Sequence, residues 1–302
     1  MVSPAAGVSR QGIAAALGAY LTWGLFGLYF KALAGLPAAE VLAHRVLGGA
    51  LFALIVLVAV RQTGEVREIL ADCRRLRQLA ASALAIAINW GLFIWAVTHG
   101  RALEASMGYF IFPLVSVVLA RLVLKETLDR RRQVAVAVVA AGVGWMMLRG
   151  HGVPWVALVL AASFGAYGLI RKTAPVSALA GLFIEAALLA PLALLYLAWA
   201  KGGAVLHADG RTQALLAVAG PVTAIPLALF AVAARRLPLA TIGLLMYVNP
   251  SIQMAVAVWV FGETFTAAHA VTFAAIWIGL AIYSWPVRRR EPLQASAPSL
   301  RL

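Results

Sequence analysis

The residues best suited to chemistry are a few ionisable side chains that lie within long apolar runs. Glu40, His44 and Arg45 fall near the start of one run, and Glu185 falls inside another. An ionisable group in the hydrocarbon of a bilayer is costly unless it faces a cavity or a partner, so such groups often mark a transport path. The spacing of four residues puts Glu40 and His44 on one helix face. These side chains are therefore candidates for binding a charged solute or a proton.

Arg45 and Glu185 are expected at similar depths if each run is a helix that crosses a membrane. Each residue is about 12 Å from the end of its run, counting 1.5 Å per residue. In a hydrocarbon core of ~30 Å, the two charges then lie within roughly 6 Å of each other in depth. A direct or substrate-bridged Arg45–Glu185 pair is geometrically allowed. Two interpretations stay open: the pair lines a central cavity and binds substrate or a proton, or it is structural and locks helix packing.

Further candidates surround these charges. An unperturbed histidine titrates between pH 5 and 8, so His44 is a candidate proton site, with a structural hydrogen bond as the alternative. Glu40 and Glu104 lie near predicted helix ends, where we expect them to reach water, with a gating role as the alternative. Amphipathic residues suited to an apolar binding cavity are Trp23, Asn89, Trp90, Tyr109, Tyr247, Asn249 and Gln253. Aromatic packing and interhelical amide bonds are the alternative for each of them.

The sequence contains no pattern for nucleotide, metal or covalent chemistry. It has no Walker A loop, no HExxH and no GxSxG. The single cysteine, Cys73, excludes an intramolecular disulfide and a CxxC metal site, and we expect an inert loop thiol. The histidines are too scattered along the chain to form a catalytic cluster. We therefore expect no enzymatic activity, no metal site and no cofactor.

The composition is that of a membrane protein. Apolar residues make up 63% of the 302 residues and charged residues only 12%, whereas a soluble domain has about a quarter charged residues. A formal net charge of +14 would suggest nucleic acid as the partner of a soluble protein. Here the basic residues lie in short gaps between apolar runs, so we interpret them as topology signals and expect no nucleic-acid partner.

Ten apolar runs predict an all-α integral membrane protein with ten transmembrane helices, because a helix needs about 20 apolar residues to span a bilayer. The runs are 11–31, 37–60, 79–99, 103–124, 133–148, 153–170, 178–199, 212–234, 239–261 and 268–286. Basic residues concentrate in alternate gaps. By the positive-inside rule, the N-terminal segment 1–10 and the basic tail 287–302 are then cytoplasmic.

The second half of the chain repeats features of the first. Pro113 and Glu126 recur as Pro250 and Glu263, in each case 137 positions later. The predicted five-helix repeats are residues 11–148 and residues 153–286. Because five is odd, the second repeat enters the membrane from the other side, which gives an inverted repeat of the kind that suits alternating access. A duplication with a structural role only is the alternative.

Prolines and small residues suggest which helices move and which form a scaffold. Pro113 and Pro250 are hinge candidates, because proline removes a backbone hydrogen bond within a helix. Small residues four positions apart occur in the fifth and tenth helices as Ala137 and Ala141, Ala140 and Gly144, and Ala275 and Gly279. Such pairs permit close helix contact. We expect these two helices to be scaffold, or a homodimer surface, away from the substrate path.

Several stretches together resemble a known family. They include Ala19-Tyr20-Leu21-Thr22-Trp23-Gly24, Asn89-Trp90-Gly91-Leu92-Phe93, Ala166-Tyr167-Gly168-Leu169-Ile170-Arg171-Lys172 and, most specifically, His44-Arg45 and the stretch from Glu104 to Phe110. Over residues 10–287 the chain resembles EamA-type transporters of the drug/metabolite transporter superfamily, in particular the RarD group. The resemblance implies a ten-helix permease of the bacterial inner membrane with both termini in the cytoplasm. One departure is Phe112-Pro113, where similar proteins have Asn-Pro; Asn249-Pro250 keeps the amide.

Taken together, these observations predict a secondary transporter, a permease or exporter of a small metabolite or drug-like molecule. Alternating access is the expected mechanism, and proton coupling is one option for its energy source. A non-transporting structural or sensory membrane protein is the alternative. The expected partners are a small-molecule substrate, the lipid bilayer and a second copy of the chain.

Overall fold

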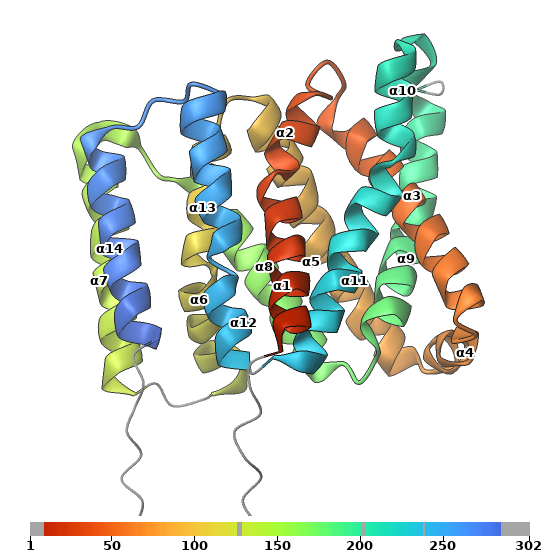
Figure 1. The fold of residues 1–302 in the computed structure, drawn as a ribbon, viewed down its shortest axis with the longest axis horizontal. Coiled ribbons are helices and arrows are strands. Elements are labelled where there is room, and N and C mark those ends of the chain that lie inside the picture. Colours follow the sequence, from red (N-terminus) through yellow and green to blue (C-terminus); the bar gives the residue numbers. More distant parts are fainter. Residues whose placement is uncertain (1–8, 126–128, 201–202, 238, 285–302) are drawn as a thin grey trace, which may run out of the picture.

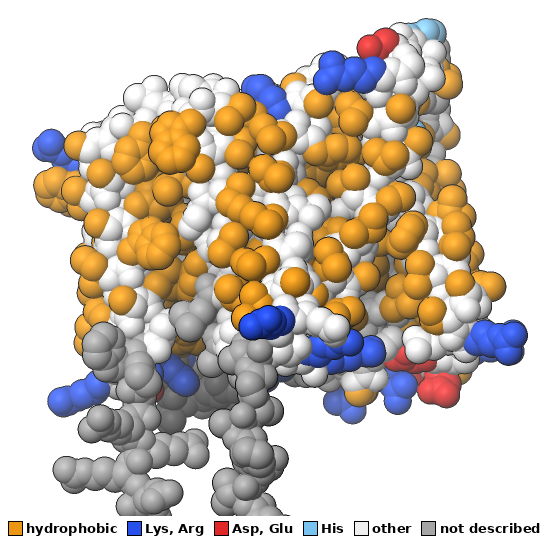
Figure 2. Space-filling view, viewed as in Figure 1, with side chains coloured by type: hydrophobic (Ala, Val, Ile, Leu, Met, Phe, Trp, Pro, Cys, Tyr) orange, Lys and Arg blue, Asp and Glu red, His pale blue; other side chains and the backbone are white. Residues whose placement is uncertain are grey.

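The computed structural model contains ten helices that are long and apolar enough to cross a membrane (Figure 1). It describes residues 9–125, 129–200, 203–237 and 239–284. The described chain begins and ends on the same side of the bundle, which we call the terminal face; the other side is the opposite face. Apolar side chains cover the visible side of the bundle, and charged side chains gather at its two faces (Figure 2). The predicted ten-helix membrane fold is confirmed; the predicted segments 1–10 and 287–302 lie almost entirely outside the described residues.

Each span consists of one helix or of several helices end to end. The single-helix spans are α3 (Ala38–Ala59), α5 (Cys73–Thr98), α6 (Ala102–Leu124), α8 (Trp155–Thr173), α9 (Ala178–Trp199) and α14 (Ala267–Ser284). The composite spans are α1 (Arg10–Gly24) with α2 (Phe26–Lys31), α7 (Arg130–Met146) with a π-helical turn (Met147–His151), α10 (Gly210–Ala217) with α11 (Ala219–Arg236), and α12 (Leu239–Leu245) with α13 (Val248–Ala255) and a π-helical turn (Val256–Val260). Outside the spans lie α4 (Thr63–Ala71) and a 3-10 turn (Ala204–His207).

The third span begins at Cys73, six residues before the expected position 79, because a charged segment continues the helix. Asp72 caps this segment: its carboxylate accepts hydrogen bonds from the backbone N–H groups of Arg74 and Arg75 at 2.9 and 3.1 Å. Those N–H groups, that of Arg75 most, and the nearby guanidinium charges hold the pKa of Asp72 below its usual range. Cys73 is therefore an exposed residue in the first turn of a helix, and its assignment to a loop is wrong.

Helices α7 and α14 pack side by side at one end of the bundle (Figure 1). A Cβ atom added to Gly142 would come within 2.5 Å of the Cβ of Ala275, and one added to Gly279 within 2.6 Å of Val139. Small residues therefore allow the close contact, as predicted for Ala275 and Gly279. The other predicted small residues do not take part: Ala137, Ala140 and Ala141 are exposed, and Gly144 has open space beside it.

The remaining spans form a bundle with a regular pairing. Helix α1 packs against α11 and α13, and α8 packs against α5 and α6. Between these two groups, α3 packs against α9, α3 contacts α11, and α9 contacts α5. Matching each span with the span five places away in the chain pairs these contacts with one another. The contacts of α1 with α11 and α13 then correspond to those of α8 with α5 and α6, and the contact of α3 with α11 corresponds to that of α9 with α5. This is the pattern expected of two five-helix repeats.

The two groups of three spans differ in their continuity. The spans of α1, α11 and α13 are interrupted, at Leu25, at Val218, and between Leu245 and Val248. Their counterparts α8, α5 and α6 run without a break. Pro113 lies inside the continuous α6, whereas Pro250 lies in the first turn of α13, just after the interruption. Of the two hinge candidates, only Pro250 therefore coincides with a break in its helix.

Candidate functional site

Arg45 is buried in the bundle, with 5% of its surface exposed. Its Nε atom donates a hydrogen bond to Oγ1 of Thr223 at 3.0 Å. Its guanidinium carbon lies 4.0 Å from the ring centroid of Trp90 and within 5.5 Å of the rings of Phe26 and Phe30. We call these five residues the Arg45 cluster. They come from α2, α3, α5 and α11, so four elements distant in sequence define the position of one charge.

A crossing of two helices at glycine residues makes the Arg45–Thr223 contact possible. A Cβ atom on Gly48 would lie 3.0 Å from the backbone nitrogen of Gly220, and one on Gly220 would overlap the carbonyl of Gly48. The backbones of α3 and α11 therefore touch directly. Gly48 and Gly220 each lie three residues from their polar neighbour, Arg45 or Thr223, on the same helix. The close approach thus brings a short hydroxyl within reach of the guanidinium group.

No carboxylate among the described residues pairs with Arg45. Neither terminal nitrogen donates a hydrogen bond to a described residue, so the hydrogen bond from Nε is the side chain's single one. Contacts with aromatic rings stabilise a desolvated cation by about 2 kcal/mol. The desolvation of a buried ion costs several kcal/mol, which is more than the rings supply. The charge on Arg45 is therefore only partly compensated by the protein.

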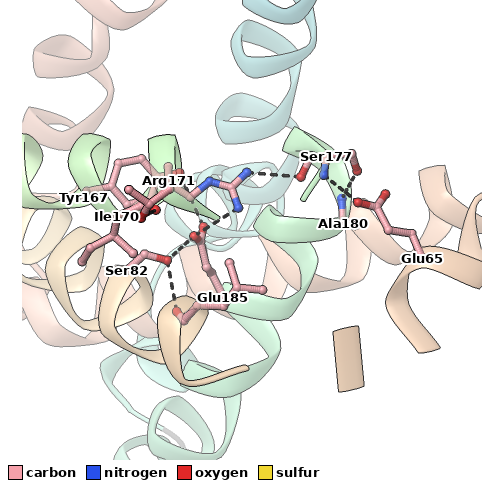
Figure 3. Close-up of polar contacts among 10 residues, drawn as sticks. Glu65, Ser82, Tyr167, Ile170, Arg171, Ser177, Ala180 and Glu185 are labelled. Atoms are coloured by element: carbon pink, nitrogen blue, oxygen red, sulfur yellow. Dashed lines mark hydrogen bonds and ion pairs between the residues drawn. The ribbon is translucent and has the colours of Figure 1, made fainter. Parts of the chain in front are cut away.

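Glu185 occupies a different and better compensated cluster on α9 (Figure 3). Its carboxylate accepts a hydrogen bond from the Ser82 hydroxyl on α5 and a 3.5 Å bond from the Tyr167 hydroxyl on α8. Nη1 of Arg171 lies 3.7 Å from Oε1. We call Glu185, Ser82, Tyr167 and Arg171 the Glu185 cluster. Unlike Arg45, this buried charge has an oppositely charged partner and two hydroxyl donors.

The Glu185 cluster connects to the terminal face through Arg171. A Cβ atom on Gly181 would overlap the Arg171 guanidinium, so this glycine leaves the space in which Arg171 reaches Glu185. Nη2 of Arg171 donates to the Ser177 carbonyl at 3.2 Å, and the Ser177 N–H donates to Glu65 on α4 at 2.6 Å (Figure 3). A chain of polar groups thus runs from the surface to Glu185. The predicted run 153–170 ends one residue before Arg171, whereas Arg171 lies in the last turn of α8 and reaches Glu185.

A shallow surface depression of about 460 Å³ lies at the terminal face between α5 and α8. Its lining residues are Arg74, Arg77, Gln78, Ala81, Ile170 and Thr173. Ala81 and Ile170 are the chain neighbours of Ser82 and Arg171, so the depression reaches the same level of α5 and α8 as the Glu185 cluster. The Arg45 cluster lies farther from this face.

Arg45 and Glu185 do not pair directly in this structure, because each has its own set of partners. Arg45 is the eighth residue of α3, which begins at the opposite face, and Glu185 is the eighth residue of α9, which begins at the terminal face. Each charge is thus about 10 Å from its own end of a helix roughly 33 Å long. The two antiparallel helices therefore separate the charges by about 12 Å in depth, more than expected from the sequence.

The two clusters occupy corresponding positions in the two halves of the chain. Glu185 follows Arg45 by 140 positions, and Thr223 follows Ser82 by 141. In the same way, Tyr167 follows Phe26 by 141, and Arg171 follows Phe30 by 141. Each cluster thus contains a charged residue from the second span of one half and two residues from the first span of the same half. The third span of the other half adds a hydroxyl. The charges themselves have opposite signs.

Asn89 and Tyr109, two predicted cavity residues, lie together between α5, α6 and α8. The Asn89 amide nitrogen donates to the Leu160 carbonyl and to the Ser163 hydroxyl at 3.0 and 3.2 Å. Its amide oxygen accepts a 2.9 Å bond from Tyr109. Asn89 therefore has partners on both neighbouring helices, as expected of an interhelical amide.

Glu40 and Glu104 hold backbone segments together at the opposite face; the expectation of reaching water is wrong for Glu40, whereas the Glu104 side chain keeps 12% of its surface exposed. Glu40 is 1% exposed and accepts a 2.8 Å bond from the N–H of Val205. Glu104 accepts from the N–H of Val156 at 2.9 Å and pairs with Arg101 at 2.6 Å. Glu104 thereby satisfies a backbone donor at the start of α8, and Glu40 one in the 3-10 turn.

Glu263 plays a similar part and was noticed in the sequence only as a repeat marker. Its two oxygens accept bonds from the N–H groups of Ala102 and Leu103 at 2.7 and 2.8 Å, which caps the start of α6. Its counterpart in the repeat, Glu126, lies outside the described residues. Glu263 and Glu104 thus hold the starts of α6 and α8 at the opposite face, and Glu40 holds the 3-10 turn there.

The other predicted residues fall into separate places. Trp23 packs against Tyr20 and Phe230, and its carbonyl accepts a 3.4 Å bond from Gln253. The Gln253 amide nitrogen also donates to Asn249 at 2.9 Å. Tyr247 stacks on the ring of Phe110. Trp90 alone among the predicted aromatic residues contacts Arg45.

His44 lies next to Arg45, and its Nε2 atom is buried without a hydrogen-bond partner among the described residues. The structure therefore does not show the hydrogen bond that the structural alternative expected on this nitrogen. In the described part of the chain, no three His, Cys, Asp or Glu side chains form a group that could hold a metal ion.

Similarity to known proteins gives independent information. Residues 10–148 match the EamA-like transporter family. The chain is 45% identical over 296 residues to an uncharacterised transporter of Pseudomonas aeruginosa, and the match covers 94% of this chain and 97% of that protein. It is 40% identical over 278 residues to protein RarD of Escherichia coli, with coverage of 91% and 94%.

Two further matches extend the comparison. A protein of Pseudomonas aeruginosa named chloramphenicol-sensitive protein RarD is 31% identical over 293 residues, with coverage of 95% of this chain and 98% of that protein. A solved crystal structure with 18% sequence identity has the same fold, with a TM-score of 0.59 over 96% of this chain and all of the other.

Proposed function

Since this chain belongs to the RarD group of EamA-type transporters in the drug/metabolite transporter superfamily, we propose that it is a secondary transporter that moves a small metabolite or drug-like molecule across the bacterial inner membrane. One observation carries this proposal: two buried charged residues, Arg45 and Glu185, lie at corresponding positions of the two halves of the bundle. Intramembrane charges are costly and mark substrate and ion paths more often than they mark packing alone.

Alternating access is the mechanism that fits this arrangement. The regular pairing of spans supports an inverted repeat, in which exchanging the conformations of the two halves exchanges the open side. Contacts of Glu40, Glu104 and Glu263 tie the helix starts at the opposite face to neighbouring segments. A surface depression lies between α5 and α8 at the terminal face. These features support a state in which the opposite face is the closed one.

The membrane orientation follows from the distribution of basic residues. Arginines on α4 and at the start of α5 lie at the terminal face, which by the positive-inside rule is the cytoplasmic one. The closed opposite face is then periplasmic. The described structure corresponds to a transporter closed toward the periplasm.

Glu185 is the proposed coupling residue. It is buried, yet polar contacts through Arg171 and Ser177 connect it to the terminal face. A carboxylate in such a place can exchange a proton with the cytoplasm when Arg171 moves away. Proton coupling would then alternate the two states of the bundle.

Transport by purified protein in proteoliposomes tests the proposal. Vesicles are loaded with a mixed pool of small metabolites, and solute release is measured by mass spectrometry with and without an inward proton gradient. We expect at least one solute to leave faster from wild-type vesicles than from empty vesicles, and Arg45→Gln and Glu185→Gln to reduce its rate tenfold or more. Glu68→Gln, which changes an exposed carboxylate on α4, is the matched control.

The same assay decides between transport and the structural alternative. If folded Arg45→Gln and Glu185→Gln proteins both released every solute at the wild-type rate, the two clusters would be packing devices. If wild type released no solute faster than empty vesicles, the proposed function would lose its support.

A further inference from the structure

The Arg45 cluster is built to hold a cation that the protein leaves without a counter-charge. We propose that it is the binding site for the acidic group of the substrate, and that the substrate is a small organic monoanion with a carboxylate and an apolar body. This inference rests on the proposed transport function and specifies its substrate class. It departs from a zwitterionic substrate bridging Arg45 and Glu185, because those two residues occupy separate clusters at different depths.

The hydrogen-bonding state of Arg45 is the first step of the argument. A guanidinium group has five N–H donors in a planar fork. One of them, on Nε, is used by Thr223, and the terminal nitrogens donate to no described residue although the side chain is 95% buried. Neither terminal nitrogen is among the fully buried polar atoms without a partner in the described residues, so both keep some accessible surface. Unpaired donors of a nearly buried cation that remain accessible point to an acceptor that binds there.

No described tyrosine or carboxylate accepts a hydrogen bond from the terminal nitrogens of Arg45 in this structure. The Tyr29 hydroxyl donates to the Leu215 carbonyl at 2.8 Å, and the Tyr109 hydroxyl donates to Asn89 at 2.9 Å. Glu185 is held by Ser82, Tyr167 and Arg171. The remaining partners of the guanidinium are the rings of the cluster, which accept no conventional hydrogen bond.

The shape of the cluster indicates the chemical class of the ligand. The Trp90 ring lies 4.0 Å from the guanidinium carbon and so covers one side of the cation. The N–H groups of a guanidinium lie in its plane, where a carboxylate accepts two parallel hydrogen bonds. Phe26 and Phe30, which are 6% and 1% exposed, make the surroundings of the cation apolar. One guanidinium balances one negative charge, which favours a monoanion over a phosphate dianion.

The contrast with Glu185 supports the same conclusion. At the corresponding position of the other half, the charged residue has an ionic partner, Arg171, supplied by the protein. The equivalent position in the Arg45 cluster is Phe30, which carries no charge. The protein therefore supplies a counter-charge in one cluster and none in the other, where a ligand can supply it.

Direct binding to purified full-length protein in detergent tests the inference. Isothermal titration calorimetry and thermal unfolding compare benzoate, phenylacetate and hexanoate with benzamide, phenylacetamide and hexanamide, and with benzylamine and phenyl phosphate. We expect saturable binding of at least one carboxylate, a dissociation constant at least tenfold higher for its amide, and no binding of benzylamine. Arg67→Gln, which removes an exposed arginine on α4, should bind as wild type does.

Variants of Arg45 separate ligand binding from folding. Arg45→Lys retains the charge without the planar fork, so we expect a folded protein that binds the carboxylate at least tenfold more weakly. Arg45→Gln should abolish binding. The inference is overturned if amides bind as tightly as carboxylates, if no carboxylate binds saturably to wild type at millimolar concentration, or if folded Arg45→Lys binds with unchanged affinity.

Failure of the inference and failure of the proposed function give different results. If proteoliposomes transport a neutral or cationic solute and no carboxylate binds, transport stands and the substrate class is wrong. If carboxylates bind through Arg45 but no solute crosses the membrane, the binding site stands and the transport function is wrong.

Discussion

At the scale of single residues, Glu185 and Arg45 differ in how far the protein fills their hydrogen-bonding capacity. Glu185 has two hydroxyl donors and a cationic partner. Arg45 has one hydroxyl acceptor and three rings. A substitution at Glu185 should therefore affect stability according to which of these contacts the new side chain retains.

Glutamine and leucine at position 185 should have separable effects. In Glu185→Gln the new amide oxygen can still accept from Ser82 and Tyr167. Glu185→Leu removes that acceptor and the counter-charge of Arg171, although Ser82 keeps its bond to the Leu79 carbonyl and Arg171 its bond to the Ser177 carbonyl. Removing one member of a buried ion pair costs about 3 kcal/mol or more, and the Tyr167 hydroxyl left without an acceptor adds roughly 1 kcal/mol or more. We expect Glu185→Leu to lower the free energy of unfolding in mixed micelles by at least about 3 kcal/mol.

The milder variant then reports on function. Glu185→Gln should be destabilised less than Glu185→Leu, because it keeps the hydrogen bonds and loses only the charge, and it should lose any stimulation of transport by a proton gradient. Equal destabilisation by glutamine and leucine would show that the charge itself, rather than the hydrogen bonds, holds this cluster together.

The sequence allowed the charged residues of both clusters to be singled out, but not their partners. Arg45 and Glu185 stand out because a charge within an apolar run is rare. Thr223 and Ser82 do not stand out, since a hydroxyl residue is common in a membrane helix. Arg171 was misplaced because it lies at a helix end, where a basic residue also serves as a topology signal. Assigning these partners requires the packing of helices that are distant in sequence.

At the scale of elements, the crossing of α3 and α11 determines the geometry of the Arg45 cluster. Backbone contact at Gly48 and Gly220 leaves no room for a methyl group. Small residues at such crossings are a general device for close helix packing in membranes, where dispersion and hydrogen bonds replace the hydrophobic effect. The glycine pair lies about one turn from both Arg45 and Thr223.

Alanine at Gly220 should push these helices apart. The added Cβ would overlap the Gly48 carbonyl, so Gly220→Ala should lower the unfolding midpoint temperature and weaken the Arg45–Thr223 contact. Overpacking of this kind typically costs about 1–3 kcal/mol. Gly144→Ala is the matched control, because nothing lies beside Gly144 and alanine is a better helix former by about 1 kcal/mol. Thermal unfolding in detergent with circular dichroism compares the two, and an equal or higher midpoint for Gly220→Ala would contradict the rigid crossing.

Helix positions were predictable from apolar run lengths, whereas the interruptions were not. The ten runs matched the ten spans because each must cross the same thickness of hydrocarbon. Leu25 and Val218 interrupt their spans without a proline at the break. Pro250 hinted at the third interruption, but Pro113 sits within a continuous helix. Whether a proline breaks a helix depends on neighbouring helices, which the local sequence does not specify.

At the scale of the whole molecule, the proposed orientation makes a simple prediction about the single cysteine. Cys73 is exposed at the terminal face. A bulky, membrane-impermeant maleimide should therefore label it in inverted inner-membrane vesicles and leave it unlabelled in intact spheroplasts. The reagent reaches the cytoplasmic face only in the inverted preparation.

A reversed control makes this measurement decisive. His207 is exposed at the opposite face, so the double variant Cys73→Ser, His207→Cys should be labelled in spheroplasts and protected in inverted vesicles. Labelling of Cys73 in intact spheroplasts would place the terminal face outside the cell and reverse the proposed direction of access.

The uncompensated charge on Arg45 also has an electrical consequence. If the site binds a monoanion, the loaded site is neutral and the empty site is positive. The membrane potential then acts mainly on the empty protein, with about 2.3 kcal/mol for each elementary charge moved across 100 mV. A potential that is negative inside would hold the empty site toward the cytoplasm and slow its return to the periplasm. Net current would therefore accompany the return of the empty transporter. The membrane voltage would change how often the binding site faces each side of the membrane, and it would leave the affinity of the site for the anion unchanged.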